Sequence, residues 1–243
     1  MSAVRRFVAV VMLAVAGTAA WGWWSGRIEL PARFNPWAPL DLAEAPGILT
    51  RFKLMRLADQ PPAACLAWLD AAGVKHTPLA DRQEPGGCGW QGATRLSAFG
   101  GVRLTTSAPL ACPAVVALAL WERHGLQAAA QARLGGQVVA IDHLGSYACR
   151  DIAGSAAGRR SEHARANALD VAAFRLADGR RISVLGDWKV GPAGADGESA
   201  AALFLQDAEK AACPFFSAVL GPAYNAAHRD HFHLDRGRYS ICR

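Results

Sequence analysis

The sequence predicts an α+β fold, in which a small antiparallel or mixed sheet is flanked by helices and held by disulfides. One supporting observation is the order of patterns: helical segments come early in the domain and strand segments of mixed type cluster late. The other is an even number of cysteines, all after the N-terminal apolar segment: Cys65, Cys88, Cys112, Cys149, Cys213 and Cys242. In an oxidising compartment these would form three disulfides, with fifteen pairings open. The chain contains no CxxC pair, which argues against a metal site built from cysteines.

The composition is that of a folded domain. Hydrophobic residues make up 52% of the 243 residues and charged residues 19%, which argues against extended disorder and allows one sizeable core. The net charge of +6 is compatible with an anionic polymer as a partner. However, the chain lacks a basic run interleaved with aromatic residues, so we expect no nucleic-acid partner.

Residues 1–26 form an apolar N-terminal segment. Arg5 and Arg6 precede an uncharged stretch, residues 7–24, whose 18 residues are just enough to span a bilayer. Basic residues before such a stretch predict export of the C-terminal part of the chain. A peptidase cutting after Ala16 or Ala20 would release the domain, and a retained segment would anchor it.

The anchor is the favoured alternative, because the segment ends in tryptophans that suit a membrane interface and not a cleavage site: Trp21, Trp23 and Trp24. We therefore expect a periplasmic domain held at the inner membrane, or a secreted one if the segment is cleaved. Residues 27–62 are rich in proline and predict an extended linker. The folded domain is expected to cover residues 63–243.

The first half of the domain predicts two helices with strands between them. A short helix from Ala63 is stopped by Gly73, and strands follow near residues 91–96 and 102–105 after a glycine-rich turn. A longer helix opens at Cys112, where the following proline fits a first helical position.

The second half predicts most of the sheet. A strand from residue 137 to 141 runs on towards 150, and 168–176 is apolar enough for a buried strand. The Asp178-Gly179 pair predicts a tight turn into a further strand at 181–185. Glycine-rich loops are expected at 154–160 and 191–197.

The chain ends in a helix and a strand. Residues 198–212 have a helical pattern, with a continuation to Leu220 kinked at Pro214 and stopped by Gly221-Pro222. The last strand is expected over 229–235.

Three of the seven histidines fall in the run from His228 to Asp235, which contains this strand: His228, His231 and His233. Residues two apart on a strand share a face, so His231 and His233 would point the same way while Phe232 points into the core. Two imidazoles on one face can start a divalent metal site, or supply one ligand and one base.

His163 and Asp170 are the other candidate ligands. On a helix, seven residues would separate them by about 10 Å along the axis, too far to share an ion easily. A loop that runs into a strand can bring them together. With His233 they make a His, carboxylate and His set that leaves a fourth zinc position for water, which is the layout of a catalytic site on the sheet.

These residues match a family pattern. The motifs are Tyr147-x-Cys-Arg150, Ser161-Glu-His-Ala-Arg165, Asn167-Ala-Leu-Asp170, Asp187-Trp188 and Asn225-x-x-His-Arg-Asp-His-Phe-His233. The stretch from about Cys65 to the C-terminus resembles the bacterial extensin-like C-terminal domain. It is also similar to zinc peptidases that include D-Ala-D-Ala carboxypeptidases and the penicillin-insensitive murein endopeptidase.

The resemblance implies zinc ligands at His163, Asp170 and His233, and hydrolysis of an amide in a peptidoglycan stem peptide. Zinc would polarise the scissile carbonyl and acidify its water, and a base would take the proton. His231 and Asp230 are both candidates for that base, and strand parity favours His231. The resemblance places Arg150 near the substrate, where it could stabilise the carbonyl oxygen or pair with a carboxylate.

Several neighbouring residues have lesser expected roles. Ser161 could orient the first ligand through a hydrogen bond, and His228 could line the cleft. The family pattern usually has glycine where Ala166 stands, so a positive φ there would strain this chain. Three histidines receive no function: His76, His124 and His143. Three tryptophans are expected in the core: Trp90, Trp121 and Trp188.

Two non-enzymatic alternatives stay open. One is a non-catalytic cell-wall-binding module that keeps zinc for structure, and the other is a periplasmic protein that stores or senses zinc. Neither needs His231, Asp230 or Arg150, so the presence of these residues favours the hydrolase. The bond that is cut, whether a terminal D-Ala or a cross-link, is not specified by the sequence.

Overall fold

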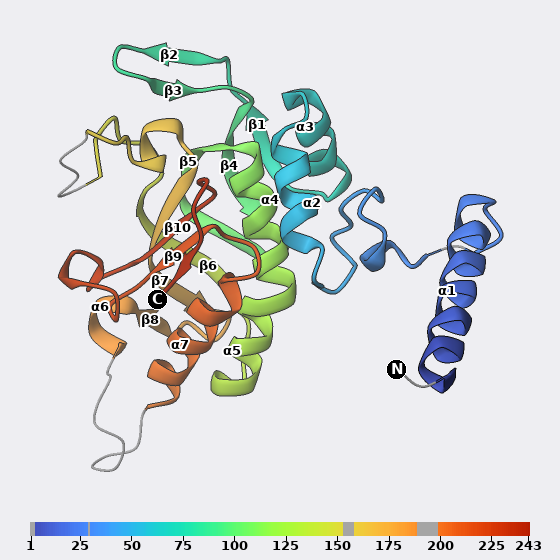
Figure 1. Ribbon diagram of the computed structural model, residues 1–243. Coiled ribbons are helices and arrows are strands. Elements are labelled where there is room, and N and C mark those ends of the chain that lie inside the picture. Colours follow the sequence, from blue (N-terminus) through green and yellow to red (C-terminus); the bar gives the residue numbers. More distant parts are fainter. Residues whose placement is uncertain (1–2, 29, 153–157, 189–198) are drawn as a thin grey trace.

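The computed structural model describes residues 3–28, 30–152, 158–188 and 199–243. It confirms the predicted class, because helices surround a mixed sheet (Figure 1). Within the described residues this sheet has nine strands, which makes it larger than the small sheet expected. The loop expected at 191–197 and the first residue of the helix expected from 198 lie outside the described residues, as does most of the loop at 154–160.

The main sheet runs in the order β1-β4-β5-β6-β7-β10-β9-β11, with β8 paired to β7. Its pairs are antiparallel, except for β5 with β6 and β9 with β11. The strands are β1 (Lys75–Pro78), β4 (Ala93–Phe99), β5 (Val102–Ala111), β6 (Val138–Gly145), β7 (Ala168–Leu176), β8 (Arg181–Ser183), β9 (Ala218–Leu220), β10 (Phe232–Asp235) and β11 (Ile241–Cys242). A separate hairpin pairs β2 (Arg82–Glu84) with β3 (Cys88–Trp90).

The α-helices are α1 (Ala3–Trp24), α2 (Thr50–Ala58), α3 (Pro62–Ala71), α4 (Cys112–Trp121), α5 (Gln127–Leu134), α6 (Val184–Asp187) and α7 (Ala200–Ala212). A π-helical turn, Glu122–Leu126, joins α4 to α5. The expected order of early helices and late strands is wrong, because β1 to β5 all precede α4. Their short alternating patterns pack as antiparallel neighbours, which needs only brief turns.

Helix α4 forms the centre of the core. It is apolar on all sides, and such a helix has no face to offer to water. Figure 1 places it between the sheet and the pair α2 and α3. Trp121 is fully buried, donates its indole N–H to the Ala208 carbonyl at 3.0 Å, and meets Phe174 edge to face. Trp121 is therefore a core residue as expected, whereas Trp90 and Trp188 are only half-buried.

The expectation of an extended linker over 27–62 is wrong for its second half. Residues 50–58 form α2, whose Leu54 and Leu57 are buried in the core cluster beside α4. The preceding segment is fixed to the domain as well, since Trp68 donates to the Leu40 carbonyl at 2.8 Å and His124 bonds the Leu42 carbonyl at 2.8 Å. The prediction relied on the proline content of this segment. Burial of the leucines of α2 in the core outweighs the tendency of the prolines to keep the chain extended.

Three further expectations change near the C-terminal half. The helix does not continue past Pro214: Ala218–Leu220 pairs with β10 as β9, so burial in the sheet outweighs local helical pattern. The strand at 181–185 stops early, because Ser183 caps α6 by accepting the Gly186 N–H at 3.1 Å. The strand from 137 ends at Gly145 instead of running on towards residue 150. The hairpin turn at Asp178-Gly179 is confirmed, with Gly179 at φ +89°.

The six cysteines form three disulfides: Cys65–Cys112, Cys88–Cys149 and Cys213–Cys242. They join α3 to α4, β3 to the segment before Arg150, and the end of α7 to β11. Helix α1 is long and apolar enough to cross a membrane. Such a helix near the N-terminus, together with disulfides, indicates a signal or anchor segment and a location outside the cytoplasm.

Candidate metal centre

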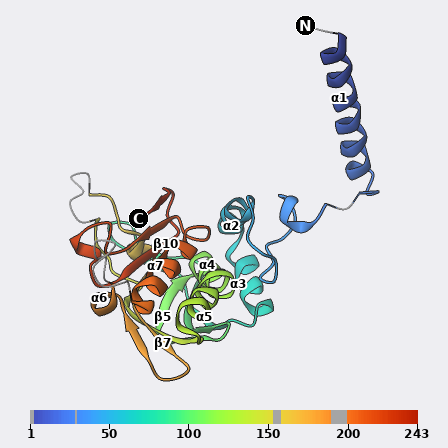
Figure 2. The same ribbon diagram turned by 90° about the horizontal axis from the view of Figure 1, so that it is seen from below.

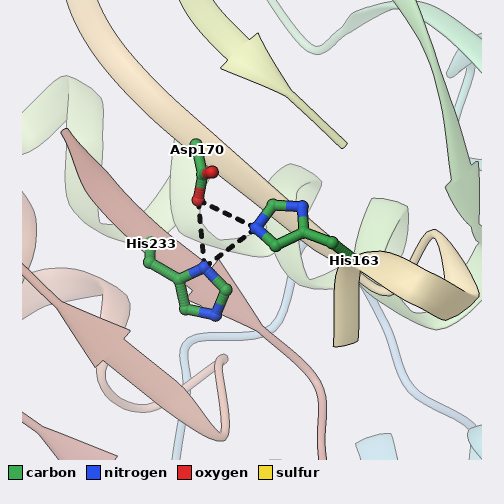
Figure 3. A group of neighbouring side chains, drawn as sticks. All are labelled: His163, Asp170 and His233. Carbon is green, nitrogen blue, oxygen red and sulfur yellow. Dashed lines mark hydrogen bonds and ion pairs between the residues drawn. The ribbon is translucent and has the colours of Figure 1, made fainter. Parts of the chain in front are cut away.

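Two neighbouring strands bring the first two candidate ligands together. β7 and β10 pair antiparallel, and His233 lies directly opposite Asp170 in their register. Residues opposite each other across an antiparallel pair place their side chains on the same face, a few ångströms apart. A sequence separation of 63 residues thus becomes a direct contact (Figure 3).

A one-turn 3₁₀ helix, Glu162–Arg165, brings in the third candidate, His163. Ser161 precedes this turn in extended conformation, and its hydroxyl oxygen accepts the His163 N–H at 3.3 Å. Ser161 therefore orients the ligand through the backbone rather than through the ring. The turn ends at Ala166, whose φ of +52° makes it the only described non-glycine residue with positive φ. The strain anticipated at the usual glycine position is present.

The three side chains converge on one point. His163 Nε2 lies 3.1 Å from Asp170 Oδ1 and 3.1 Å from His233 Nδ1, and His233 Nδ1 lies 2.9 Å from Asp170 Oδ1. Ligands at zinc bond lengths in a tetrahedron are separated by about 3.3 Å, so this triangle needs only a slight expansion to hold the ion. All three residues are buried. The donor set therefore fits a divalent metal such as zinc.

The opposite ring nitrogens are held by the protein. His163 Nδ1–H donates to the Ser146 carbonyl at 3.3 Å, and His233 Nε2–H donates to Asp235 Oδ2 at 3.0 Å. These bonds fix the tautomers so that the lone pairs of His163 Nε2 and His233 Nδ1 both face Asp170 Oδ1. Lone pairs aimed at a carboxylate repel each other unless a cation or a proton lies between them, and metal-binding histidines are usually oriented in this way.

Asp235 is a functional residue that the sequence reasoning missed. Its side chain is fully buried, and it accepts the Tyr239 hydroxyl at 2.7 Å and the Gly237 N–H at 2.9 Å as well as the His233 ring. A signal was available: Asp235 lies two residues after His233 and therefore on the same strand face. Tyr239 and Gly237 follow β10 in a turn, and no pattern in the sequence announces their contacts.

The pKa values reflect a tight charge cluster. Burial opposes ionisation of Asp170, but hydrogen bonds and charge from His163 and His233 outweigh it and hold the pKa of Asp170 well below its usual range. Burial likewise disfavours protonated His233, yet its bonds with Asp170 and Asp235 raise the pKa of His233 to about 9. Asp235 has a lowered pKa, because the His233 bond outweighs its burial. Without a metal, a proton would occupy this cluster at neutral pH.

The two candidate bases form a pair. His231 lies outside β10, which begins at Phe232 after the turn capped by Asn225. The strand-parity premise is therefore wrong. Its ring nevertheless reaches the cluster, with Nε2 at 3.6 Å from Asp170 Oδ1. Its Nδ1–H donates to Asp230 Oδ1 at 2.8 Å. Asp230 thus stands behind His231 and His231 stands beside the metal ligands.

A cleft of about 510 Å³ opens at this cluster. Arg150 is exposed at its wall, and His228 contributes a half-buried ring 5.9 Å from that of His233. Burial and the neighbouring histidines lower the pKa of His228 to about 4, which keeps its ring neutral. The other lining residues include Ser161, Tyr224, Asn225, His231, His233 and Tyr239. The cleft therefore brings together a cation, the neutral His228 ring and one candidate metal ligand, His233.

The remaining histidines lie outside the cluster and make ordinary contacts. His76 bonds Thr94 and Asp70, His124 bonds a backbone carbonyl of the N-terminal segment, and His143 bonds the Thr106 carbonyl. Each therefore has a structural partner.

A family model for the extensin-like protein C-terminus matches residues 63–243, which is most of the chain. The chain belongs to the extensin-like protein C-terminus family. No curated protein and no solved structure shows a significant match.

The extensin-like domain contains all six candidate site residues, from Arg150 to His233, and all three disulfides. Helix α2 precedes the matched residues although it packs into the same core. In this chain the physical domain is thus longer at its N-terminus than the extensin-like match.

Proposed function

We propose that this extensin-like domain is a zinc-dependent hydrolase that cleaves an amide bond in peptidoglycan stem peptides or their cross-links, as a DD-endopeptidase or DD-carboxypeptidase. One observation carries the proposal. Three buried ligand atoms converge beside a cleft that one of them, from His233, lines, and a hydrogen-bonded His231–Asp230 pair stands next to them. A site that only stores metal has no need of a base with its own carboxylate partner.

His163, Asp170 and His233 would hold the metal. Bound there, zinc supplies the Lewis acidity that polarises a carbonyl and makes water acidic near neutral pH. Their orientation is preset by the Ser146 carbonyl and Asp235, so little rearrangement is needed on binding. Burial excludes bulk water and strengthens each of these electrostatic contacts.

His231 is the proposed general base. Its Nδ1–H is engaged by Asp230, which leaves the Nε2 lone pair to accept a proton from the attacking water. Asp230 stabilises the imidazolium that results, and this imidazolium then returns the proton to the leaving amine. Burial and neighbouring positive charge keep His228 neutral, so its ring would not repel that imidazolium.

Arg150 is proposed to bind the substrate. It stands at the wall of the cleft rather than in the ligand cluster, where a guanidinium can pair with a stem-peptide carboxylate or with the oxygen that gains charge. The motifs around Arg150, His163, Asp170 and His233 resemble those of zinc D,D-peptidases, which supports this substrate class. The proposed location is the periplasm, with α1 as an inner-membrane anchor.

The experiment is digestion of purified, cross-linked peptidoglycan by the full chain in mild detergent, with muropeptides identified by mass spectrometry. The full chain is needed because α2 belongs to the core. Wild type is compared with and without a chelator, after restoring zinc, and with His163→Ala. The control is His143→Ala, since the His143 ring bonds the Thr106 carbonyl and is not part of the cluster.

Loss of cross-linked dimers that requires zinc and His163 would establish an endopeptidase, and shortened stem peptides would establish a carboxypeptidase. Unchanged muropeptides from a folded protein that binds zinc would reject the hydrolase. Retained binding to insoluble peptidoglycan in that case would favour a wall-binding module.

A further inference from the structure

Among the described residues outside α1, exposed large apolar side chains are most frequent between residues 28 and 55. Within residues 34–55 five are exposed, among them Trp37 at 66% and Ile48 at 87%. Across the described part of residues 63–243 only four are exposed, and these are scattered: Leu144, Leu185, Tyr224 and Tyr239. We call the five the apolar face: Phe34, Trp37, Ile48, Phe52 and Met55. Grouped exposure of this kind marks an interaction surface rather than ordinary surface chemistry.

The apolar face is built on a rigid base. Residues 31–46, here called the strap, are held by side chains of α2: Lys53 Nζ donates to the Ala32 carbonyl at 2.7 Å, and Arg56 donates to the Pro36 carbonyl at 2.6 Å. The buried leucines of α2 face the core. The strap therefore presents Phe34 and Trp37 from a fixed position beside α2.

The exposed side chains of the strap and α2 are contiguous. The Arg56 guanidinium lies over the Trp37 ring at 4.9 Å. Phe52 is four residues before Arg56 and three before Met55, so these side chains are neighbours on the outer side of the helix. Trp37, Arg56, Phe52 and Met55 thus form one continuous patch.

The charge around the apolar face is positive. Arg33 and Arg51 are exposed next to it, and Arg56 lies within it. Three acidic residues lie in the same region, and of these Glu44 is paired with the buried Lys53 at 3.5 Å, while Asp41 and Asp59 are exposed. Aromatic and apolar side chains beside arginines suit the interface of an anionic lipid bilayer.

The position in the chain identifies which bilayer. Helix α1 ends at Trp24 and the strap begins at Pro31, so the connection reaches at most about 25 Å even when fully extended. Figure 1 shows the chain running from α1 through the strap to α2. If α1 spans a membrane, the apolar face cannot leave the vicinity of that membrane.

We propose that the apolar face docks on the outer surface of the same lipid bilayer that α1 crosses, with Phe34, Trp37, Ile48, Phe52 and Met55 in the headgroup region and the arginines on anionic lipid. In both ribbon views α4 separates β10 from α2 (Figures 1 and 2). Docking through α2 therefore leaves the cleft on the side remote from the bilayer. The tether and the surface act together, because two membrane signals hold more firmly than one.

Site-specific photocrosslinking tests this in the full chain. The protein is reconstituted into vesicles of phosphatidylethanolamine and phosphatidylglycerol, with photoreactive benzoylphenylalanine replacing Phe52 or, separately, Trp37. Matched controls replace Leu144 or Leu185, which are 60% and 66% exposed against 66% for Trp37 and 41% for Phe52, and which share the same tether. We expect lipid adducts at positions 37 and 52 at least several-fold above those at 144 and 185.

A second arm separates docking from mere proximity. With the probe at position 37, Phe52→Glu combined with Met55→Glu should reduce the lipid adduct several-fold, whereas Leu185→Glu should leave it unchanged. All three substituted side chains are exposed. Melting temperatures equal to that of the unsubstituted protein would verify that the variants fold. Equal lipid adducts at all positions, or adducts at 37 and 52 to another copy of the chain, would overturn the proposal.

Discussion

Two cavities in the described part of the domain differ in chemistry far more than in size. The cleft at the candidate metal centre has a volume of about 510 Å³. The other cavity, of about 630 Å³, lies between the β2–β3 hairpin and the ends of α2 and α3, with Arg165, Asn167 and Arg236 along one side. The larger cavity has no group of convergent metal-ligating atoms, since the one such group among the described residues is His163, Asp170 and His233.

Two of the charged groups that line the larger cavity pair with each other. Arg82 pairs with Glu84, and Glu84 also accepts the Tyr147 hydroxyl. This carboxylate already has its partners on the cavity wall, so it is not left to bind a reacting group. In the cleft, by contrast, tautomers and burial leave two lone pairs and a carboxylate aimed at one point. The comparison teaches that ligand atoms held in fixed positions where they repel one another indicate a functional site better than the volume of a cavity does.

The largest expected effect is loss of the metal. His163→Ala removes one of three ligands and leaves only Asp170 and His233 to hold the ion, so we expect zinc to be lost in dialysis and hydrolysis to fall to background. Zinc content per chain and muropeptide release measure this. Gln91→Ala, on the wall of the larger cavity, serves as the control and should change neither quantity. Comparable losses from Gln91→Ala would erase the distinction between the cavities.

The next effect separates the two candidate bases. His231→Gln should lower kcat by about 10²–10⁴-fold while zinc content stays at the wild-type level, because His231 is not among the three ligands. Asp230→Asn should cost less, since Asp230 acts through His231. kcat and zinc content are measured on the same preparations. A loss from Asp230→Asn greater than that from His231→Gln would reverse the assignment.

The sequence anticipated the ligands better than their supports. His163, Asp170 and His233 were predictable because a histidine-rich run, an acid in an apolar strand and the family motif agree on them. Asp235 could have been found from its place two residues after His233 on the same strand, but Tyr239 escaped because nothing in one sequence shows which turn folds back over a strand. The same limit applies to α2: its proline-rich flanks suggested a tether, and only packing against α4 shows that Leu54 and Leu57 are core residues. Long-range burial decides such cases.

Proton competition gives the third effect. Because its bonds with Asp170 and Asp235 outweigh burial and raise the pKa of His233 to about 9, a proton must leave before the metal binds. Zinc affinity should therefore rise about tenfold per pH unit from about pH 6.5 to 9 and then level off. Competition with a chelator of known affinity measures it. An affinity that is flat over this range would show that His233 is already neutral.

The stability of the metal-free protein should change in the opposite direction. A pKa raised in the folded state stabilises the fold fully below the unfolded value near pH 6.5, and that contribution is lost as pH rises through about 9. Urea midpoints of the chelated protein should decrease over this interval. With zinc bound the decrease should disappear.

The orienting carboxylate has a smaller effect. Asp235→Asn keeps the size of the side chain but removes the charge that holds His233 Nε2–H, so zinc affinity should weaken about 10–100-fold. Tyr239→Phe removes one of the bonds to Asp235 and should weaken it less. Zinc titration reports both without requiring activity. Unchanged zinc affinity in Asp235→Asn would mean that strand β10 alone fixes the orientation of the His233 ring.

The smallest effect concerns the wall between the two cavities. His163 Nε2 lies 3.1 Å from Nδ1 of His233, which lines the cleft, while Arg165 and Asn167 line the larger cavity. The turn at Ala166 therefore lies between the two cavities. Alanine in left-handed conformation costs roughly 1–2 kcal/mol, which glycine avoids.

Ala164, two residues earlier, is equally buried but lies in the 3₁₀ turn, where glycine brings only the loss of a methyl group and greater unfolded-state freedom. Ala166→Gly should therefore be more stable than Ala164→Gly by about 1–2 kcal/mol in urea unfolding, which is the cost of the left-handed conformation. Equal stabilities would mean that the turn relaxes around alanine. In that case the position of His163 depends on the following strand β7 rather than on the turn. The difference between the two cavities would then depend on β7 as well.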